Sequence, residues 1–140
     1  MKTTVKVKQP DLSLDQPNQT LYRAVALETK KRIRVRTETS KKDYLGRGFK
    51  KYTQEYKQFR SKKGRSTTPN LSFSGKMLGS MRTLFTKKKG TVTLSGEQAK
   101  IARGNEARGR IFFALHKTDR DKILGLVTNW MTRKNKLKKR

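Results

Sequence analysis

The sequence predicts a small α+β domain in which a short antiparallel β-sheet packs with an N-terminal helix, short helices and a C-terminal helix. The chain has 140 residues, the length of one ordinary domain with a single core. Two long segments, residues 21–36 and 118–134, place apolar side chains at helical spacing. Two short β-branched and apolar runs, 83–86 and 91–94, flank a lysine-glycine turn, which is typical of a β-hairpin.

The polar N-terminal residues are expected to lie outside the main core. Residues 2–8 alternate in polarity and could pair as a short edge strand, but Pro10 and Pro17 interrupt the polar segment after them. The expected organisation is an N-terminal arm or edge strand (1–19), a single α+β domain (20–133) and a basic C-terminal tail (134–140).

The first predicted helix begins near Leu21, with Asn18 or Thr20 as its cap, and ends at about Arg36. Its apolar positions recur at helical spacing and define one buried face: Leu21, Ala24, Val25, Leu27 and Ile33. Basic residues on the other face are expected to point to solvent: Arg23, Lys30, Lys31 and Arg34.

Residues 40–48 have turn composition, and Gly46 and Gly48 are expected to supply the positive φ values of a tight reversal. Four aromatic residues come next at helical spacing: Phe49, Tyr52, Tyr56 and Phe59. This spacing predicts a helix that packs these rings on the core. Stacking of the rings on nucleic-acid bases is the alternative.

The segment before the hairpin is predicted to contain a loop, a short strand and one helical turn. Residues 61–70 have loop composition, and Leu71 and Phe73 alternate with serines as in a strand. Ser74 is the expected cap of the helical turn. The turn is expected to bury Met77, Leu78 and Met81.

The predicted hairpin spans residues 82–95, and Gly90 is expected to be the left-handed residue of its turn. Three consecutive lysines, 87–89, precede this glycine. They are expected to stand at an exposed tip.

After the hairpin, Ser95 is expected to cap a short helix that Gly104 ends, and residues 108–115 form an apolar run of strand length. The last helix is expected to begin with Thr118 as its cap and Asp121 three positions on, as in a capping box, and to end near residue 134. Its apolar stripe is the strongest helical pattern in the chain: Ile123, Leu124, Leu126, Val127, Trp130 and Met131.

The charge of the chain indicates a polyanionic partner. Lysine and arginine number 37 against 10 aspartates and glutamates, which gives a net charge of +27. Chains this basic usually bind nucleic acid or acidic protein surfaces. The stretch between Tyr56 and Gly96 has ten basic residues and no acidic one, and the last ten residues have six basic residues and no acidic one, so the charge is spread over the chain with a basic tail.

Several function classes are excluded by composition. The chain has no cysteine and a single histidine, His116, which excludes disulfides, thiolate metal sites and histidine-rich zinc sites. No window approaches the roughly 20 apolar residues of a membrane span. Residues 74–80 contain Gly-Lys without the spacing of a phosphate-binding loop, and no nucleophile with its base can be assembled. We expect a binding or assembly protein, not an enzyme, with no cofactor.

The order of motifs is more informative than any one of them. A turn-aromatic element contains Asp43, Gly46, Phe49, Tyr52 and Tyr56. A glycine-methionine-leucine block comes next with Leu71, Ser74, Gly75, Met77, Leu78, Ser80 and Met81. After the hairpin and the small-residue helix comes an Arg-x-Phe-Phe-x-Leu element: Arg110, Phe112, Phe113, Leu115, Asp119 and Ile123. Between about residues 21 and 131 the chain resembles the phage virion morphogenesis or tail-completion family of head–tail joining proteins.

The resemblance implies a tail-terminator-like α+β fold and a structural role in the neck or tail of a tailed bacteriophage. It implies a homo-oligomeric ring, hexameric or dodecameric, made in the host cytoplasm and assembled into the virion. Its expected partners are portal, connector, stopper or tail-tube proteins. The hairpin and the N-terminal strand could supply contacts between subunits by adding strands across the boundary.

The basic residues predicted to face a polyanion are Lys87, Lys88, Lys89, Arg133, Lys134, Lys136, Lys138, Lys139 and Arg140. Their target is expected to be either packaged DNA, through non-specific phosphate contacts, or an acidic neighbouring ring. A sequence-independent nucleic-acid-binding protein of ribosomal or nucleoid type is the alternative to the virion role. A small nuclease is disfavoured because no set of His, Asp and Glu residues suits it.

Overall fold

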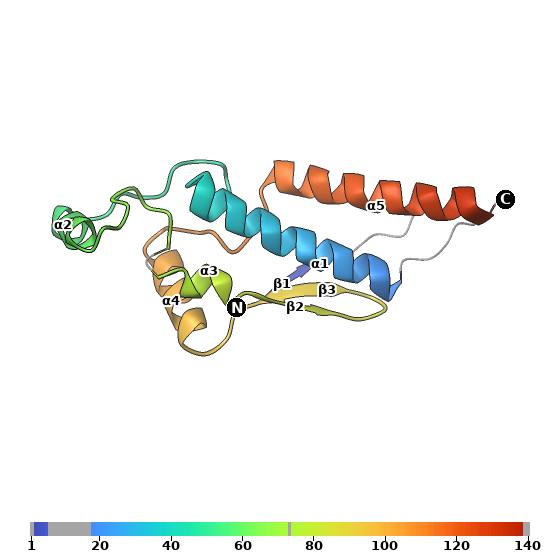
Figure 1. Cartoon of the computed structure of the whole chain (residues 1–140), viewed down its shortest axis with the longest axis horizontal. Helices are drawn as coiled ribbons and strands as arrows, with labels where there is room; N and C mark the ends of the chain where they lie inside the picture. Colours follow the sequence, from blue (N-terminus) through green and yellow to red (C-terminus); the bar gives the residue numbers. More distant parts are fainter. Residues whose placement is uncertain (1, 6–17, 73, 139–140) are drawn as a thin grey trace.

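The computed structural model describes residues 2–5, 18–72 and 74–138, and it confirms the α+β class. The chain order is β1 (Lys2–Val5), α1 (Gln19–Arg34), η1 (Val35–Thr39, a π-helical turn), α2 (Gln54–Lys62), α3 (Lys76–Gly79), β2 (Arg82–Phe85), β3 (Gly90–Thr93), α4 (Gly96–Ala107) and α5 (Lys117–Lys138). The molecule is elongated, with α2 at one end and the C-terminus of α5 at the other (Figure 1).

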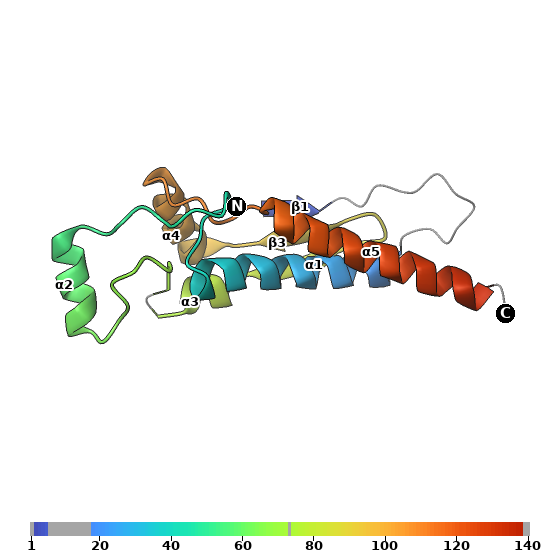
Figure 2. The same ribbon diagram turned by 90° about the horizontal axis from the view of Figure 1, so that it is seen from above.

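The sheet is antiparallel, with strand order β1-β3-β2. Val92 pairs with Thr83 on β2 and with Thr3 on β1, so the predicted hairpin is confirmed and residues 2–5 form an edge strand. Residues 6–8 of the predicted strand lie outside the described residues. Helix α1 packs between the β2–β3 hairpin and α5, as two perpendicular views agree (Figures 1 and 2).

Two hydrophobic clusters hold these layers together. One lies between α1 and α5 and contains Leu21, Val25, Ile123, Val127 and Met131. The other joins the sheet to the irregular segments and to α3 and α4; its residues include Ile33, Phe49, Met77, Leu78, Val92 and Phe112. Most of the periodic apolar positions of the two long helices therefore connect the layers, but Leu27 of α1 and Leu124 of α5, which were predicted on these stripes, are 48% and 64% exposed.

Helix α1 begins as predicted, because the Asn18 side chain accepts a hydrogen bond from the Leu21 N–H at 3.2 Å. Its C-terminal end differs from the prediction. Arg36 and Thr37 continue the apolar stripe onto the buried face, and the chain passes through the π-helical turn η1 before it leaves the helix. Of the basic residues predicted to face solvent, Lys30 is half-buried and the other three are exposed or half-exposed.

The role predicted for Gly90 is wrong. This glycine has no positive φ and is the first residue of β3. A Cβ atom there would lie 2.7 Å from the Tyr22 carbonyl oxygen of α1, so glycine permits the close approach of helix and sheet. The turn is instead held by Thr86, whose N–H donates to the Lys89 carbonyl at 2.8 Å and whose hydroxyl accepts from the Lys88 N–H.

Helix α2 starts later than predicted. Phe49 and Tyr52 lie in an extended segment and are buried, and the helix begins only after Thr53, whose hydroxyl accepts from the Tyr56 N–H at 3.3 Å. The expected packing of all four rings on the core is wrong for Tyr56 and Phe59, which are 37% and 46% exposed. The N-cap at Thr53 starts α2 after Phe49 and Tyr52, so the single helix that the aromatic spacing predicted does not form.

The predicted strand at residues 108–115 is not formed, and the segment is irregular. Phe112 and Phe113 are adjacent and both buried, an arrangement that a half-buried strand with alternating sides does not allow. The carbonyls of Phe112 and Ala114 accept hydrogen bonds from the Arg36 guanidinium at 2.6 and 2.7 Å. An arginine therefore satisfies the backbone groups that a neighbouring strand would have satisfied.

The predicted short strand at Leu71 is also absent. Leu71 has a φ of 55° in a bend, and Phe73 lies outside the described residues. The helical turn after it is confirmed as α3, although Gly75, with a φ of 78°, takes the cap position. The Ser74 hydroxyl accepts from the Lys76 N–H at 3.4 Å.

Two turn glycines differ from expectation. Of the two glycines in the reversal at 40–48, only Gly46 has a positive φ, and the other left-handed residue of the reversal is Lys41. Helix α4 passes Gly104 and ends at Ala107, and Gly109 adopts the left-handed conformation after it. Ser95 occupies the cap position of α4 without a side-chain hydrogen bond to the helix.

Helix α5 begins with His116 as its cap, not Thr118. The His116 Nδ1 accepts from the Thr118 N–H at 3.2 Å, and the Asp119 carboxylate accepts from the His116 N–H at 3.1 Å. Asp119, not Asp121, is therefore the acidic residue of the capping box. The helix also continues past residue 134 to Lys138, because Lys, Arg and Leu favour helix and no glycine or proline interrupts them.

Candidate interaction sites

Residues 50–72 form the most prominent surface feature of the molecule, which we call the α2 arm. Two connecting segments carry α2 away from the helices and the sheet of the body (Figures 1 and 2). Arg60 holds the arm together from inside, with a side chain only 1% exposed. Its guanidinium donates to the carbonyls of Ser66 at 2.5 Å and Ser72 at 3.1 Å, which ties α2 to the returning segment.

The base of the α2 arm is built around Tyr52. The Cζ atoms of Arg60 and Arg110 lie 5.0 and 4.9 Å from its ring centroid, so two guanidinium groups flank one tyrosine. Arg110 also donates to the Lys50 carbonyl at 3.0 Å, which fixes the point where the arm leaves the body. Burial raises the pKa of the Tyr52 hydroxyl above its ordinary value, against the opposing effect of Arg60.

A cleft of about 500 Å³ opens between the α2 arm, α3 and α4, and we call it the α2 cleft. Its lining residues include three arginines and no acidic residue. They are Tyr52, Thr53, Tyr56, Arg60, Leu71, Ser74, Gly75, Met77, Gln98, Ile101, Asn105, Arg108 and Arg110. The cleft thus combines an apolar floor and aromatic rings with concentrated positive charge.

The residues of the three motif elements are mostly brought together in the core. Phe49, Met77, Leu78, Phe112 and Phe113 belong to one cluster, with Leu115 packed against it. Gly46 and Gly75 are in left-handed turns. Tyr52 and Arg110 meet at the base of the α2 arm, whereas Tyr56 points away from the core. The motif residues therefore build the scaffold and the origin of the arm.

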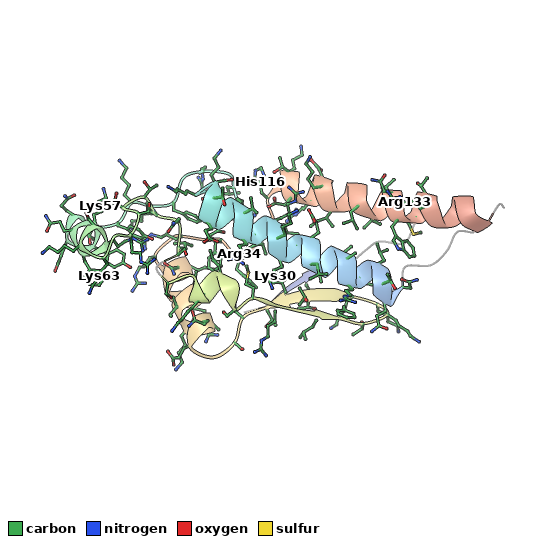
Figure 3. The ribbon with its side chains drawn as sticks, in the orientation of Figure 1. Lys30, Arg34, Lys57, Lys63, His116 and Arg133 are labelled. Atoms are coloured by element: carbon green, nitrogen blue, oxygen red, sulfur yellow. The ribbon has the colours of Figure 1, made fainter. Side chains whose placement is uncertain are left out.

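The residues predicted to face a polyanion lie toward one end of the molecule. Lys87, Lys88 and Lys89 are exposed in the hairpin turn, and Arg133 is exposed on α5 (Figure 3). The hairpin turn and the C-terminal half of α5 lie at the same end in both views (Figures 1 and 2). Lys134, Lys136 and Lys138 are in the last turns of α5. Lys139 and Arg140 lie outside the described residues.

Further exposed cations lie at the opposite end of the molecule, on the α2 arm. Lys57 is half-exposed, Lys62, Lys63 and Arg65 are exposed, and Figure 3 shows Lys57 and Lys63 around α2. The acid-free stretch of the sequence indicated this charge without locating it. Positive charge is thus presented at both ends of the long axis.

Several of the ten acidic residues form ion pairs or hydrogen bonds within the molecule. Asp119 pairs with Arg36 at 2.5 Å in a buried site, and Asp43 accepts from the Leu45 N–H at 2.9 Å. Glu28 pairs with Arg32 at 2.7 Å. Burial raises the pKa of Glu106, although its carboxylate accepts from the Phe113 N–H. The internal use of acids leaves an outer surface dominated by cations.

The sequence motifs include Tyr52, Tyr56, Gly75, Met77 and Arg110, but they do not predict that these residues line one cleft, and they do not include Arg60, Asn105 or Arg108. The available signal was spacing, since Tyr52, Tyr56 and Arg60 recur at intervals of four. No group of three or more His, Cys, Asp or Glu residues suited to a metal ion occurs within the described residues. Across the same residues, no helix has the length and apolar character needed to cross a membrane.

In comparisons with known proteins, the chain matches no protein-family model, no curated protein and no solved structure.

Proposed function

We propose that this chain is a structural component of a tailed bacteriophage virion, a neck or tail-completion protein that joins head and tail as a homo-oligomeric ring. The ordered motif elements of the sequence support the family assignment. The observation that carries the assembly role is the α2 arm, which projects from the body with Tyr56 and Phe59 exposed on it. Function in such a protein resides in its surfaces and not in a catalytic centre.

In a monomer the α2 arm has two unfavourable features, a short isolated helix and exposed aromatic rings. Helix α2 has nine residues, fewer than the roughly 12–15 at which an isolated helix becomes marginally stable in water. The rings of Tyr56 and Phe59 stack with centroids 6.0 Å apart and present a small apolar surface to solvent. Burial of this surface on a neighbouring subunit accounts for both features, and repetition of one such head-to-tail contact closes a ring.

The sheet offers a second kind of contact. Strand β3 is central, and β1 and β2 are the two outer strands of the described sheet. Outer strands present backbone N–H and C=O groups that can pair with a strand of another chain. Strand addition from a neighbouring subunit would extend the sheet across the boundary.

A charge placed on the arm tests its role in self-association. Phe59→Asp is expected to lower the assembled fraction of the purified protein, because the new carboxylate would be desolvated in the contact. Native mass measurement over a concentration series gives the readout. Leu124→Asp is the matched control, since Leu124 is 64% exposed and belongs to α5, outside the α2 arm. An assembled fraction that falls for Leu124→Asp but not for Phe59→Asp would contradict the arm contact.

The virion role is tested in particles. The chain should be present in purified virions, and particles made without it should show heads and tails apart or tails of abnormal length in electron micrographs. Heads and tails apart would support joining, and abnormal lengths would support termination of the tail. Absence of the chain from purified virions would contradict the proposal.

The three exposed hairpin lysines favour a second candidate, a sequence-independent nucleic-acid-binding protein. If the lysines contact phosphate, the logarithm of affinity for duplex DNA falls with the logarithm of salt by about 0.9 per phosphate contacted. Replacing Lys87, Lys88 and Lys89 by glutamine is then expected to reduce this slope by up to about three. If the affinity of the native protein for duplex DNA did not change with salt concentration, phosphate contact would be excluded and an acidic protein would be left as the target.

A further inference from the structure

We propose that the α2 cleft binds an acidic peptide segment of a partner protein, one that carries a bulky apolar side chain between carboxylates. The cleft lies within a single chain, so this inference does not depend on the proposed ring. Its volume of about 500 Å³ falls within the range of roughly 300–1,000 Å³ that ligand sites occupy.

The charge of the cleft selects an anionic occupant. Arg60, Arg108 and Arg110 line it, and the lining has no aspartate or glutamate. Among the residues that the structure describes, neither Arg108 nor Arg110 forms an ion pair. Arg108 is exposed at the mouth and is free to turn toward a ligand carboxylate, where an arginine forms paired hydrogen bonds.

The floor and wall of the cleft select an apolar group beside the charge. Leu71 and Met77 are buried at the floor, and Ile101 of α4 is 48% exposed at the wall. Tyr56 of the α2 arm also lines the cleft. These apolar surfaces cannot bind a phosphate chain, but a leucine or phenylalanine side chain can pack against them. The Gln98 amide and the side-chain oxygen of Asn105 can pair with a peptide backbone, whereas the Asn105 amide nitrogen already donates to the Ile101 carbonyl at 3.2 Å.

Nucleic acid fits this cleft less well than a peptide. Strand-binding grooves track the nucleic-acid backbone with a continuous row of exposed cations. Here two of the three arginines, Arg60 and Arg110, are buried and also bonded to backbone carbonyls, so they provide fixed positive charge for a single inserted group. The exposed lysines that suit phosphate lie elsewhere, on the hairpin and on the outside of α2.

The test uses the full chain and a fluorescein-labelled peptide in which glutamates flank a leucine-phenylalanine pair (EELFEE), with binding measured by fluorescence anisotropy. Arg108→Glu is expected to weaken binding about tenfold or more. Arg103→Glu makes the same charge change at an exposed position of α4 outside the cleft, and it is expected to change affinity by less than about twofold. Ile101→Gln is expected to weaken binding severalfold.

Peptides with one feature removed complete the test. The glutamine peptide QQLFQQ and the glycine peptide EEGGEE are both expected to bind more weakly than EELFEE. Equal losses for Arg108→Glu and Arg103→Glu would show that only net charge attracts the peptide, and would overturn the inference. So would tighter binding of oligothymidine than of EELFEE with the same dependence on Arg108. Both arginine variants change exposed residues, so the fold is expected to survive.

Discussion

Replacement of Arg36 by methionine is expected to destabilise the protein by about 3–5 kcal/mol. Arg36 is buried, pairs with the Asp119 carboxylate and donates to the carbonyls of Phe112 and Ala114. Its loss leaves a buried carboxylate without its cation and removes one hydrogen bond from each of two backbone carbonyls, of which Phe112 keeps the bond from the Ala114 N–H. A shift of the urea midpoint at unchanged slope would measure the effect.

Three further variants separate the causes of the stability loss expected for Arg36→Met. Arg34→Met removes an exposed pair with Glu38, and it is expected to cost less than about 1 kcal/mol. Arg36→Lys keeps the charge but cannot reach the carboxylate and both carbonyls together, so its cost should be intermediate. In Asp119→Asn the side-chain oxygen can still accept from the His116 N–H, so the variant removes the ion pair and retains the helix cap. Equal costs for Arg34→Met and Arg36→Met would show that Arg36 does not organise the irregular segment.

Replacement of Gly90 by alanine is expected to cost about 1–3 kcal/mol, because the added Cβ would lie 2.7 Å from the Tyr22 carbonyl and 3.1 Å from the Ala26 Cβ. The obstacle is helix backbone, which cannot rotate aside as a flexible side chain does. Thermal or urea unfolding measures the cost. The structure predicts a larger loss for Gly90→Val.

Gly125→Ala is the matched control for this substitution. Gly125 lies inside α5, and a Cβ there meets nothing within 4 Å. Alanine is expected to stabilise the helix by roughly 0.5–1 kcal/mol, through lower backbone entropy in the unfolded chain. A neutral Gly90→Ala would mean that α1 and β3 are not held as closely as the structure has them.

The elements that could be predicted are those that local patterns determine. Helix α1, the β2–β3 hairpin and α5 depend on spacing and caps within a few residues, and all three were predicted. The same local rules failed at Phe112 and Phe113. These residues have the composition of a strand, but the carbonyls of Phe112 and Ala114 accept hydrogen bonds from Arg36, which is 76 and 78 residues away in the chain. The local sequence of the segment does not indicate a hydrogen-bond partner that distant in the chain.

The α2 cleft could not be predicted for a similar reason. Its walls come from the α2 arm, α3 and α4, and only the fold brings them together. The rule that arginines face water also fails at Arg36 and Arg60, because a guanidinium with several carbonyl partners can be buried. For Arg36 the usable signal was also spacing, since Arg36 and Thr37 lie three and four positions after Ile33 on the buried stripe of α1.

The pairing of β1 with β3 sets the order in which the chain can fold. Residues 2–5 pair with residues 90–93, and α1 completes its cluster only with α5 near the C-terminus. Contacts this distant in sequence require closure of large loops, which slows folding compared with the local β2–β3 hairpin. The hairpin can thus form early in folding, whereas the β1–β3 pairing and the α1–α5 cluster must wait for closure of the large loops.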